Sequence, residues 1–229
     1  MPSVMSANPV LVLASQSPQR SALLARAGLS FTVRPASIDE TEAPGETPED
    51  YVCRVALDKG RAVATALGAA AEHQPWVILA ADTTVWLSPE GPPLGKAADR
   101  AQAQATLSTL FDAPHHYVST GIAVGHLSSE TSAGSTGKAG LTASDNRFKW
   151  RGQRVTTKVI LRPPSRAAFE RYLDGGDWRD RAGAYAIQGD AAAFVRRIEG
   201  SFTNVVGLPL AETLDLLAPF DLETRPVSL

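Results

Sequence analysis

A short apolar segment runs directly into a serine-capped helix near the start of this chain, and this pattern leaves few possible folds. Residues 10–14 (VLVLA) have strand character, and residues 18–27 have helical character. Ser17 suits the N-cap of that helix, Pro18 its first position and Gly28 the residue just past its end. We therefore predict a strand followed at once by a helix, which is the repeating unit of α/β proteins.

The turn between this strand and this helix is suited to binding an anion. A helix start presents unpaired backbone N–H groups and the positive end of the helix dipole. The hydroxyl groups of Ser15 and Ser17 and the guanidinium group of Arg20 can add donors. The alternative is a capped helix whose arginine points to solvent, and the segment alone does not decide between the two.

Length and charge limit the class of protein. The chain has 229 residues, enough for one α/β domain, or for two small lobes around a cleft. It has 22 basic and 24 acidic residues, a formal net charge of −2 and no long basic run. A polymeric nucleic acid partner is disfavoured, because such proteins carry a basic face. A small anionic ligand is compatible with this balance.

The cysteine content and the apolar segments predict a cytoplasmic protein. Cys53 is the single cysteine, so the chain can form no internal disulfide and no cysteine metal cluster. It lies in the helical pattern of residues 51–57, where a buried thiol is expected. We find no secretion signal and no apolar run of membrane-spanning length, and expect no membrane association.

The order of apolar and polar segments predicts a single α/β domain over residues 1–229. We expect strands over residues 10–14, 30–33, 76–87, 116–124, 147–161, 193–198 and 202–206, and helices over residues 18–27, 47–67, 99–111, 165–173 and 209–217. Residues 125–146 are rich in Ser, Thr and Gly, and we expect a flexible insertion without chemistry there.

Asp82 is the strongest single candidate for chemistry. It follows the continuous apolar run of residues 76–80, inside a segment of strand character. Aspartate is depleted in strands, and a carboxylate there needs a partner or an altered pKa. Ligand sites in α/β proteins lie at the carboxyl edge of the sheet, which favours a functional role. A structural carboxylate bonded to a neighbouring loop is the alternative.

Glu40 can supply a second carboxylate. Two carboxylates on separate loops can hold one Mg²⁺ ion, which prefers a few hard oxygen ligands. An acidic pair such as Asp39 and Glu40 is otherwise typical of a solvated turn. Lys59 and Lys96, taken singly, are typical of surface lysines.

Gln188 is a candidate for binding the edge of a planar group, such as a nucleotide base, through hydrogen bonds. It lies in the glycine-bounded segment of residues 182–189, and its amide can donate and accept hydrogen bonds in one plane, as a base edge requires. An exposed amide on a strand is the alternative. The four histidines have no ligand spacing, so a zinc site or a Ser-His-Asp triad is unsupported.

Taken together, these segments resemble the Maf family of nucleotide pyrophosphatases. The matching motifs follow the family's order over about residues 10–217. They are LASQSPQR (13–20), DE (39–40), ADT (81–83), GK (95–96), AGAYAIQG (182–189), IEGS (198–201) and NVVGLPL (204–210).

The resemblance implies a fold and an activity. The family fold is an elongated twisted mixed sheet with flanking helices and a deep cleft, similar to that of the inosine triphosphate pyrophosphatases and often found as a homodimer. The implied reaction is hydrolysis of a nucleoside triphosphate to the monophosphate and pyrophosphate. A divalent cation, Mg²⁺ or Mn²⁺, would assist it.

The resemblance also implies roles for the matching residues. Asp82 would act as the general base or orient the attacking water, and Glu40 would join it in binding the metal or that water. The phosphates would be held by Ser15, Ser17, Arg20, Lys59 and Lys96.

The chain is most similar to the subfamily that acts on dTTP and UTP. Thr83 and Gln188 match that subfamily, whereas Gln19 stands where its members usually carry arginine. We assign all three residues to substrate binding. Two further residues differ from the family pattern: Ala97 replaces a usual proline, and Arg181 replaces a usual lysine. Two alternatives stay open: a 7-methyl-GTP pyrophosphatase, and a nucleotide-binding regulator of cell division or septum formation in which hydrolysis is incidental.

Overall fold

A six-stranded mixed sheet forms the centre of the molecule. The computed structural model describes residues 8–68, 75–127 and 148–224. The strands are β1 (Val10–Leu13), β2 (Phe31–Val33), β3 (Trp76–Trp86), β4 (His116–Leu127), β5 (Phe148–Leu161) and β6 (Val195–Glu199). Their order in the sheet is β2-β1-β3-β4-β5-β6, with β1 parallel to β2 and β3 and the remaining pairs antiparallel.

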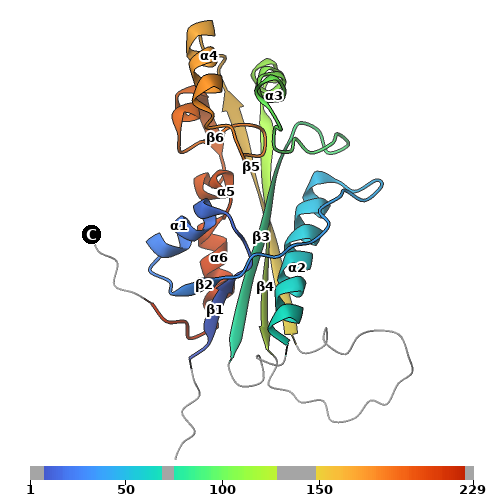
Figure 1. The fold of residues 1–229 in the computed structure, drawn as a ribbon, viewed down its shortest axis with the longest axis vertical. Coiled ribbons are helices and arrows are strands. Elements are labelled where there is room, and N and C mark those ends of the chain that lie inside the picture. The colour runs from blue at the N-terminus through green and yellow to red at the C-terminus, as the bar shows by residue number, and fades with distance from the viewer. Residues whose placement is uncertain (1–7, 69–74, 128–147, 225–229) are drawn as a thin grey trace, which may run out of the picture.

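Helices flank this sheet and extend the molecule along the long strands. They are α1 (Pro18–Arg26), α2 (Pro48–Leu67), α3 (Arg100–Asp112), α4 (Arg166–Gly175), α5 (Phe202–Val206) and α6 (Leu210–Leu217), with a 3-10 helix η2 (Asp190–Phe194) before β6. Figure 1 shows β3, β4 and β5 running along the longest axis, with α3 and α4 at one end. The predicted elongated, mixed α/β architecture is confirmed.

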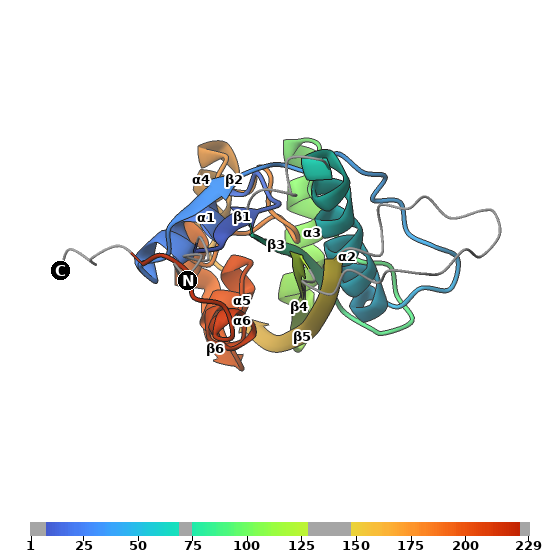
Figure 2. The same cartoon turned by 90° about the horizontal axis from the view of Figure 1, so that it is seen from below.

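Alternation along the central strands distributes apolar side chains to two faces of the sheet. Leu11 and Leu79 belong to a core with α1 and α6, whereas Val12 and Ile78 belong to a second core with α2. Figure 2 shows α2 on one side of the central strands and α5 and α6 on the other. This two-sided burial explains the unbroken apolar run of β3.

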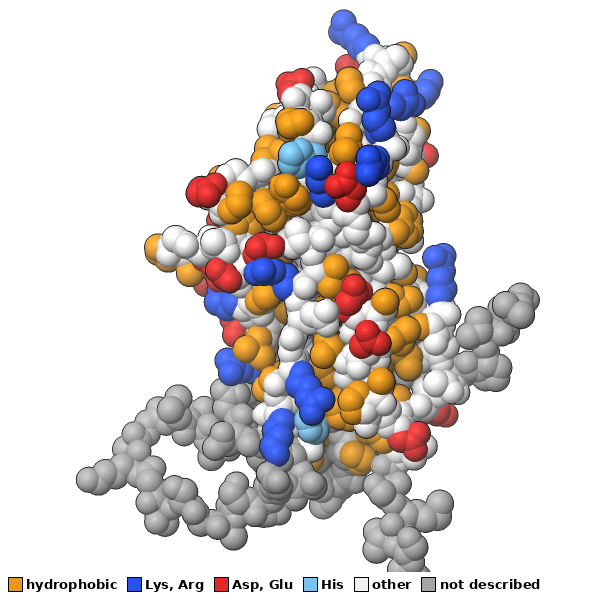
Figure 3. All heavy atoms as spheres, turned by 180° about the vertical axis from the view of Figure 1, so that it is seen from behind, with side chains coloured by type: hydrophobic (Ala, Val, Ile, Leu, Met, Phe, Trp, Pro, Cys, Tyr) orange, Lys and Arg blue, Asp and Glu red, His pale blue; other side chains and the backbone are white. Residues whose placement is uncertain are grey.

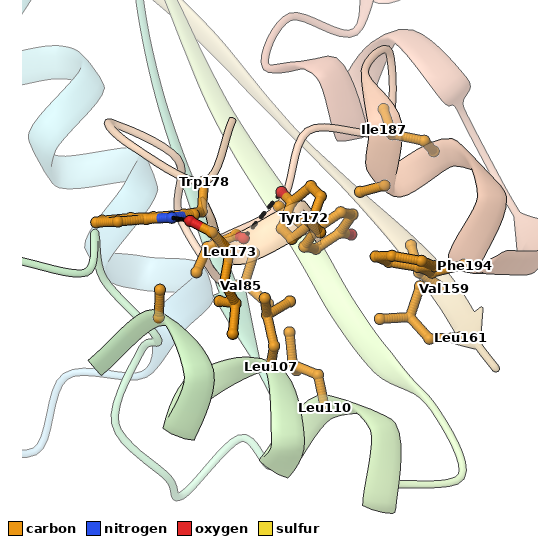
Figure 4. Packing of buried hydrophobic residues seen from close by; sticks show 14 of the residues in the cluster. Val85, Leu107, Leu110, Val159, Leu161, Tyr172, Leu173, Trp178, Ile187 and Phe194 are labelled. Carbon is orange, nitrogen blue, oxygen red and sulfur yellow. Dashed lines mark hydrogen bonds between the residues drawn. The ribbon is translucent and has the colours of Figure 1, made fainter. Parts of the chain in front are cut away.

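A third core lies at the end of the molecule that carries α3 and α4. Val85 from β3, Leu107 from α3, Tyr172 from α4 and Phe194 from η2 are all buried in it. Figure 4 shows these side chains gathered into one cluster. This core supports the segment of residues 177–189, which carries Gln188.

The predicted helix starts are confirmed at four capping side chains. The side chain of each cap accepts a hydrogen bond from the backbone N–H three residues later, and the caps are Ser17, Thr47, Asp99 and Ser165. Past the end of α1, Gly28 adopts a φ of 75°, which glycine reaches without strain.

Three expectations were wrong. Residues 202–206 form α5 rather than a strand, because Ser201 caps a helix that ends at Gly207. The strand expected from residue 193 begins at Val195, since η2 precedes it. Cys53 is exposed rather than buried, because the buried face of α2 passes through its neighbour Val52.

The expected insertion begins later than predicted. Residues 125–127 continue β4, and residues 128–146 lie outside the described residues. Within the described ranges, none of the helices has the length and apolar content needed to cross a bilayer. Figure 3 shows one face of the molecule, on which acidic and basic side chains are mixed with apolar ones. The single-domain organisation stays a prediction.

Candidate active site

A cavity of about 930 Å³ opens beside the carboxyl end of β1 and the middle of β3. Its walls come from the β1–α1 turn, the loop before α2, α2 itself, the loop before α3, residues 177–189 and the end of α5. All ten residues that the sequence assigned to a site line it. They are Ser15, Ser17, Gln19, Arg20, Glu40, Lys59, Asp82, Thr83, Lys96 and Gln188.

Asp82 lies in the middle of β3, opposite Gly121 of β4, and is only 7% exposed. Its Oδ1 atom is 2.7 Å from Nζ of Lys59. Burial raises the pKa of Asp82, while the charges of Lys59 and Arg20 oppose that shift. The carboxylate is therefore desolvated but paired with a cation, an environment in which it can accept a proton.

Lys59 joins two carboxylates from different elements. Its ammonium group lies 2.7 Å from Asp82 Oδ1 and 3.0 Å from Glu40 Oε1. Glu40 comes from the loop between β2 and α2, and its side chain is 47% exposed. Two carboxylate groups thus converge on one cation at the wall of the cavity.

Close packing of α2 on the sheet brings Lys59 to this position. A Cβ atom on Gly121 would lie 2.3 Å from the backbone oxygen of Val52, so glycine permits the approach of α2 to β4. Gly60 follows Lys59 in α2, and a Cβ atom on Gly60 would lie 2.5 Å from the ring of Trp150 on β5. Both glycines let the helix backbone lie closer to the strands than side chains would allow.

Arg20 is buried, so the solvent-facing alternative for it is wrong. It is 8% exposed, and its guanidinium group donates to Ser15 Oγ (3.1 Å), Thr83 Oγ1 (3.0 Å) and the backbone oxygen of Gly207 (2.8 Å). Burial lowers the pKa of Arg20, and the charges of Asp82 and Glu40 oppose this effect. Arg20 thereby ties the β1–α1 turn to β3 and to the end of α5.

The β1–α1 turn is ordered by its own side chains. Ser15 Oγ accepts a hydrogen bond from the backbone N–H of Ser17 (3.2 Å), and Ser17 Oγ donates to Gln19 Oε1 (3.2 Å). The Arg20 N–H donates to Ser17 Oγ at 3.5 Å. Three polar side chains and a helix start therefore face the cavity together.

Lys96 and Gln188 belong to two loops that pair with one another. Lys96 forms a backbone bridge with Ala182, and the N–H of Gly183 approaches the carbonyl oxygens of Leu94 (3.1 Å) and Gly95 (3.2 Å). Gly183 has a φ of 67°, and a Cβ atom there would lie 3.0 Å from Val85. The pairing makes one wall from both loops, with the side chain of Gln188 exposed on it.

The sequence reasoning missed several residues of the cavity wall. Tyr51 lines the cavity, and its hydroxyl group donates to the backbone oxygen of Glu40 at 3.0 Å. Asp177, Arg179 and Asp180 line it beside the expected segment, and Arg179 lies over the Trp178 ring at 4.8 Å. Nothing in the helical pattern around Tyr51 distinguishes it from a packing residue.

Two carboxylates of the cavity wall lie close enough together to share a metal. Among the side chains that the structure describes, no three His, Cys, Asp or Glu groups gather into a metal site. Asp82 and Glu40 lie within 3.0 Å of the same ammonium group, so both can reach one cation. Mg²⁺ is commonly held by one or two carboxylates together with substrate phosphates, and this pair fits that pattern.

Comparison with known proteins identifies relatives over most of the chain. The dTTP/UTP pyrophosphatase of Anaeromyxobacter dehalogenans (strain 2CP-C) is 44% identical over 209 residues, covering 91% of this chain and 93% of the relative. Those of Hahella chejuensis and Myxococcus xanthus are 40% and 42% identical, and each alignment covers at least 91% of both proteins.

The comparison with solved structures is weaker than these sequence matches. A HAM1 protein from Coxiella burnetii superposes with a TM-score of 0.48 and 17% identity, covering 92% of this chain and 99% of that one. The family model described as Maf-like protein, in contrast, matches residues 10–220. This chain belongs to the Maf family.

Proposed function

We propose that this protein is a nucleoside triphosphate pyrophosphatase that acts on dTTP and UTP. The relatives that carry this name are 40–44% identical to it over about nine tenths of its length. The observation that carries the proposal is the convergence of the buried Asp82 with Lys59 and Arg20 on one cavity. The products would be the monophosphate and pyrophosphate.

Asp82 would serve as the base, or orient the water, for attack on the α-phosphorus. Water would transfer a proton toward Oδ of Asp82 while its oxygen bonds to phosphorus, and the bond from the α-phosphorus to the bridging oxygen would break. Lys59 supports this role, because its charge opposes the rise that burial causes in the pKa of Asp82.

The cationic and hydroxyl groups of the cavity would bind the triphosphate. A bound triphosphate carries about four negative charges, and Arg20, Lys59 and Lys96 offset much of this charge. The hydroxyl groups of Ser15 and Ser17 line the same wall and can donate hydrogen bonds. Compensation is needed most on the departing pyrophosphate, since charge develops there in the transition state.

Asp82 and Glu40 would hold a divalent cation, Mg²⁺ or Mn²⁺, jointly with substrate oxygens. When bound, the ion supplies further neutralisation of phosphate charge and polarises water. Lys59 lies where it can compensate the same carboxylates before the substrate enters.

Gln188 would contact the base, because its amide lies on the cavity wall formed with the Lys96 loop. Thr83 acts differently in this geometry, since its hydroxyl group accepts from Arg20 and lies 2.9 Å from Thr120 Oγ1. We therefore assign Thr83 to positioning Arg20, and Gln19 to the β1–α1 turn.

The homodimer and the cytoplasmic location stay predictions.

A panel of nucleoside triphosphates assayed with purified protein, with and without Mg²⁺, tests the function. We expect monophosphate plus pyrophosphate, with dTTP and UTP preferred over 7-methyl-GTP. Stepwise release of orthophosphate would contradict the proposed reaction. An inactive wild-type protein that still binds nucleotide would favour the regulatory alternative.

Asp82→Asn tests the proposed base. The amide cannot accept the proton, so we expect kcat to fall by about 10²–10⁴-fold. Binding of nucleotide without Mg²⁺, measured by calorimetry, should be retained because the cationic groups stay in place. A variant with wild-type turnover would exclude Asp82 as the base.

A further inference from the structure

The loop of residues 39–46 carries Glu40 but contains neither helix nor strand. Glu40 itself is half-exposed, so burial does not hold it in place. Its Oε1 atom nevertheless lies 3.0 Å from Lys59 Nζ. Some other contact must therefore fix the loop backbone beside α2.

Arg54 of α2 makes that contact. Its Nε and Nη2 atoms lie 2.7 and 2.8 Å from the two carboxylate oxygens of Glu46, a two-point pairing with fixed geometry. Its Nη2 atom also donates to the backbone oxygen of Thr41 at 3.1 Å. One side chain thus bonds both ends of the segment that follows Glu40.

The Glu46 carboxylate also bonds the backbone of its own loop. Only 10% of its side chain is exposed, and its Oε2 atom accepts a hydrogen bond from the N–H of Ala43 at 3.0 Å. The hydrogen bond from Arg54 lowers the pKa of Glu46, so this group stays charged at neutral pH. The ion pair between Glu46 and Arg54 is therefore charged on both sides at neutral pH.

Tyr51 adds a second point of attachment from the same face of α2. Its hydroxyl group donates to the backbone oxygen of Glu40 at 3.0 Å, and its ring lies 5.6 Å from the Arg54 guanidinium group. Burial together with the charges of Asp82 and Glu40 raises the pKa of Tyr51 to about 12, so the hydroxyl group remains a donor.

We propose that Arg54 and Glu46 are positioning residues that hold the loop on α2 and keep the Glu40 carboxylate beside Lys59 and Asp82. They touch no reacting atom. The proposal rests on the function proposed above, because it assigns Glu40 a part in binding the metal or water. Helix α2 then carries both Lys59 and the side chain of Arg54, which holds the Glu40 loop in place.

Arg54→Gln and Glu46→Gln test the proposal by kinetics. We expect kcat/KM for dTTP to fall by about 10-fold or more and the Mg²⁺ concentration for half-maximal rate to rise, as is usual when a supporting partner of a metal ligand is lost. Arg54→Lys keeps the charge but not the two-point geometry and should give an intermediate loss.

A double-mutant cycle separates positioning from a general structural effect. In a Glu40→Gln background, Arg54→Gln should change kcat/KM by less than about twofold, since the residue through which it acts is already altered. Equal losses in both backgrounds would overturn the proposal. The control is Arg197→Gln on β6, which removes the same charge and a carboxylate partner 3.4 Å away, and should be neutral.

Hydrogen exchange supplies a readout that does not depend on activity. The amide of Ala43 should exchange faster in Arg54→Gln than in wild type, while the melting temperature stays close to the wild-type value. Unchanged exchange over residues 39–46 would overturn the proposal even if the wild-type protein releases no pyrophosphate. A wild-type protein without turnover but with faster exchange in the variant would instead contradict only the proposed function.

Discussion

At the scale of single residues, the site depends on a buried carboxylate that is kept next to an ammonium group. Desolvation alone would favour the neutral form of Asp82, and Lys59 at 2.7 Å favours the charged form. The charge of Arg20 also favours the ionised form of Asp82. The protonation state of Asp82 therefore depends on burial and on the charges around it, and not only on the ordinary pKa of an aspartate.

Replacing Lys59 with methionine should raise the pKa of Asp82 further. The substitution removes the larger of the two charges that oppose the effect of burial, while desolvation stays. Carbon-13 NMR of labelled aspartate across a pH series measures this pKa directly, and the acid limb of kcat/KM should move to higher pH with it.

Lys96→Met is the matched control for this measurement. Lys96 lines the same cavity but is not among the groups that shift Asp82, so the carboxyl titration should stay at the wild-type position. A Lys59→Met protein in which Asp82 titrates at or below the wild-type pH would refute the electrostatic account.

At the level of helices and strands, the packing of α2 on the sheet places both Lys59 and the Glu40 loop beside Asp82. Helix α2 carries Lys59, and its Tyr51 and Arg54 contact the Glu40 loop. The contact is tight because Gly121 of β4 has no side chain to separate the strands from the helix backbone. Displacement of α2 would move all of these groups relative to Asp82.

Gly121→Ala should destabilise the protein by about 2 kcal/mol or more, since a Cβ atom would lie 2.3 Å from the Val52 oxygen and backbone cannot move aside cheaply. Urea unfolding measures the change in free energy. Gly175→Ala in α4 is the control, because its added Cβ would meet no other described residue within 4 Å apart from its chain neighbours and the nearby backbone of its own helix. Similar stabilities for the two variants would mean that α2 can shift on the sheet.

At the scale of the whole molecule, a buried histidine joins the sheet to the core around α3 and α4. His116 of β4 is fully buried, and its Nε2 atom lies 2.9 Å from the hydroxyl group of Tyr185. Tyr185 belongs to the segment that carries Gln188 and lines the cavity. Burial lowers the pKa of His116 to about 4.

Stability should therefore fall as the pH is lowered from about 6.5 toward 4. In that window the unfolded chain binds a proton at His116 that the folded protein does not accept, so acid favours unfolding. The full effect corresponds to about 3 kcal/mol. Urea unfolding at pH 7, 5.5 and 4.5 measures the slope.

His116→Gln should flatten this dependence, because glutamine does not titrate yet can still bond Tyr185. The neighbouring His115 is partly exposed, and His115→Gln should retain most of the wild-type slope, because burial, the larger cause of the lowered pKa of His116, is unchanged. An unchanged slope in His116→Gln would assign the acid sensitivity to other groups.

Local signals explain why most of the secondary structure could be predicted. The caps Ser17, Thr47, Asp99 and Ser165 act within three residues, and the apolar run of β3 reports burial on both faces. Residues 202–206 were predicted wrongly because β-branched residues suit strands. Their helix begins at the Ser201 cap and is also held by distant contacts, since Asn204 Nδ2 donates to Val118 O and Thr157 Oγ1.

Most helices and strands and the family could be read from the amino-acid sequence, because caps and periodicity are local signals and the family motifs are short segments in a fixed order. The sequence also predicted ten site residues, all of which line one cavity. The fold was needed to show that Lys59 bridges Asp82 and Glu40, that Arg20 is buried between three segments, and that Arg54 holds the Glu40 loop on α2. These contacts arise when helices pack on the sheet, and their partners are too far apart in sequence for local patterns to specify.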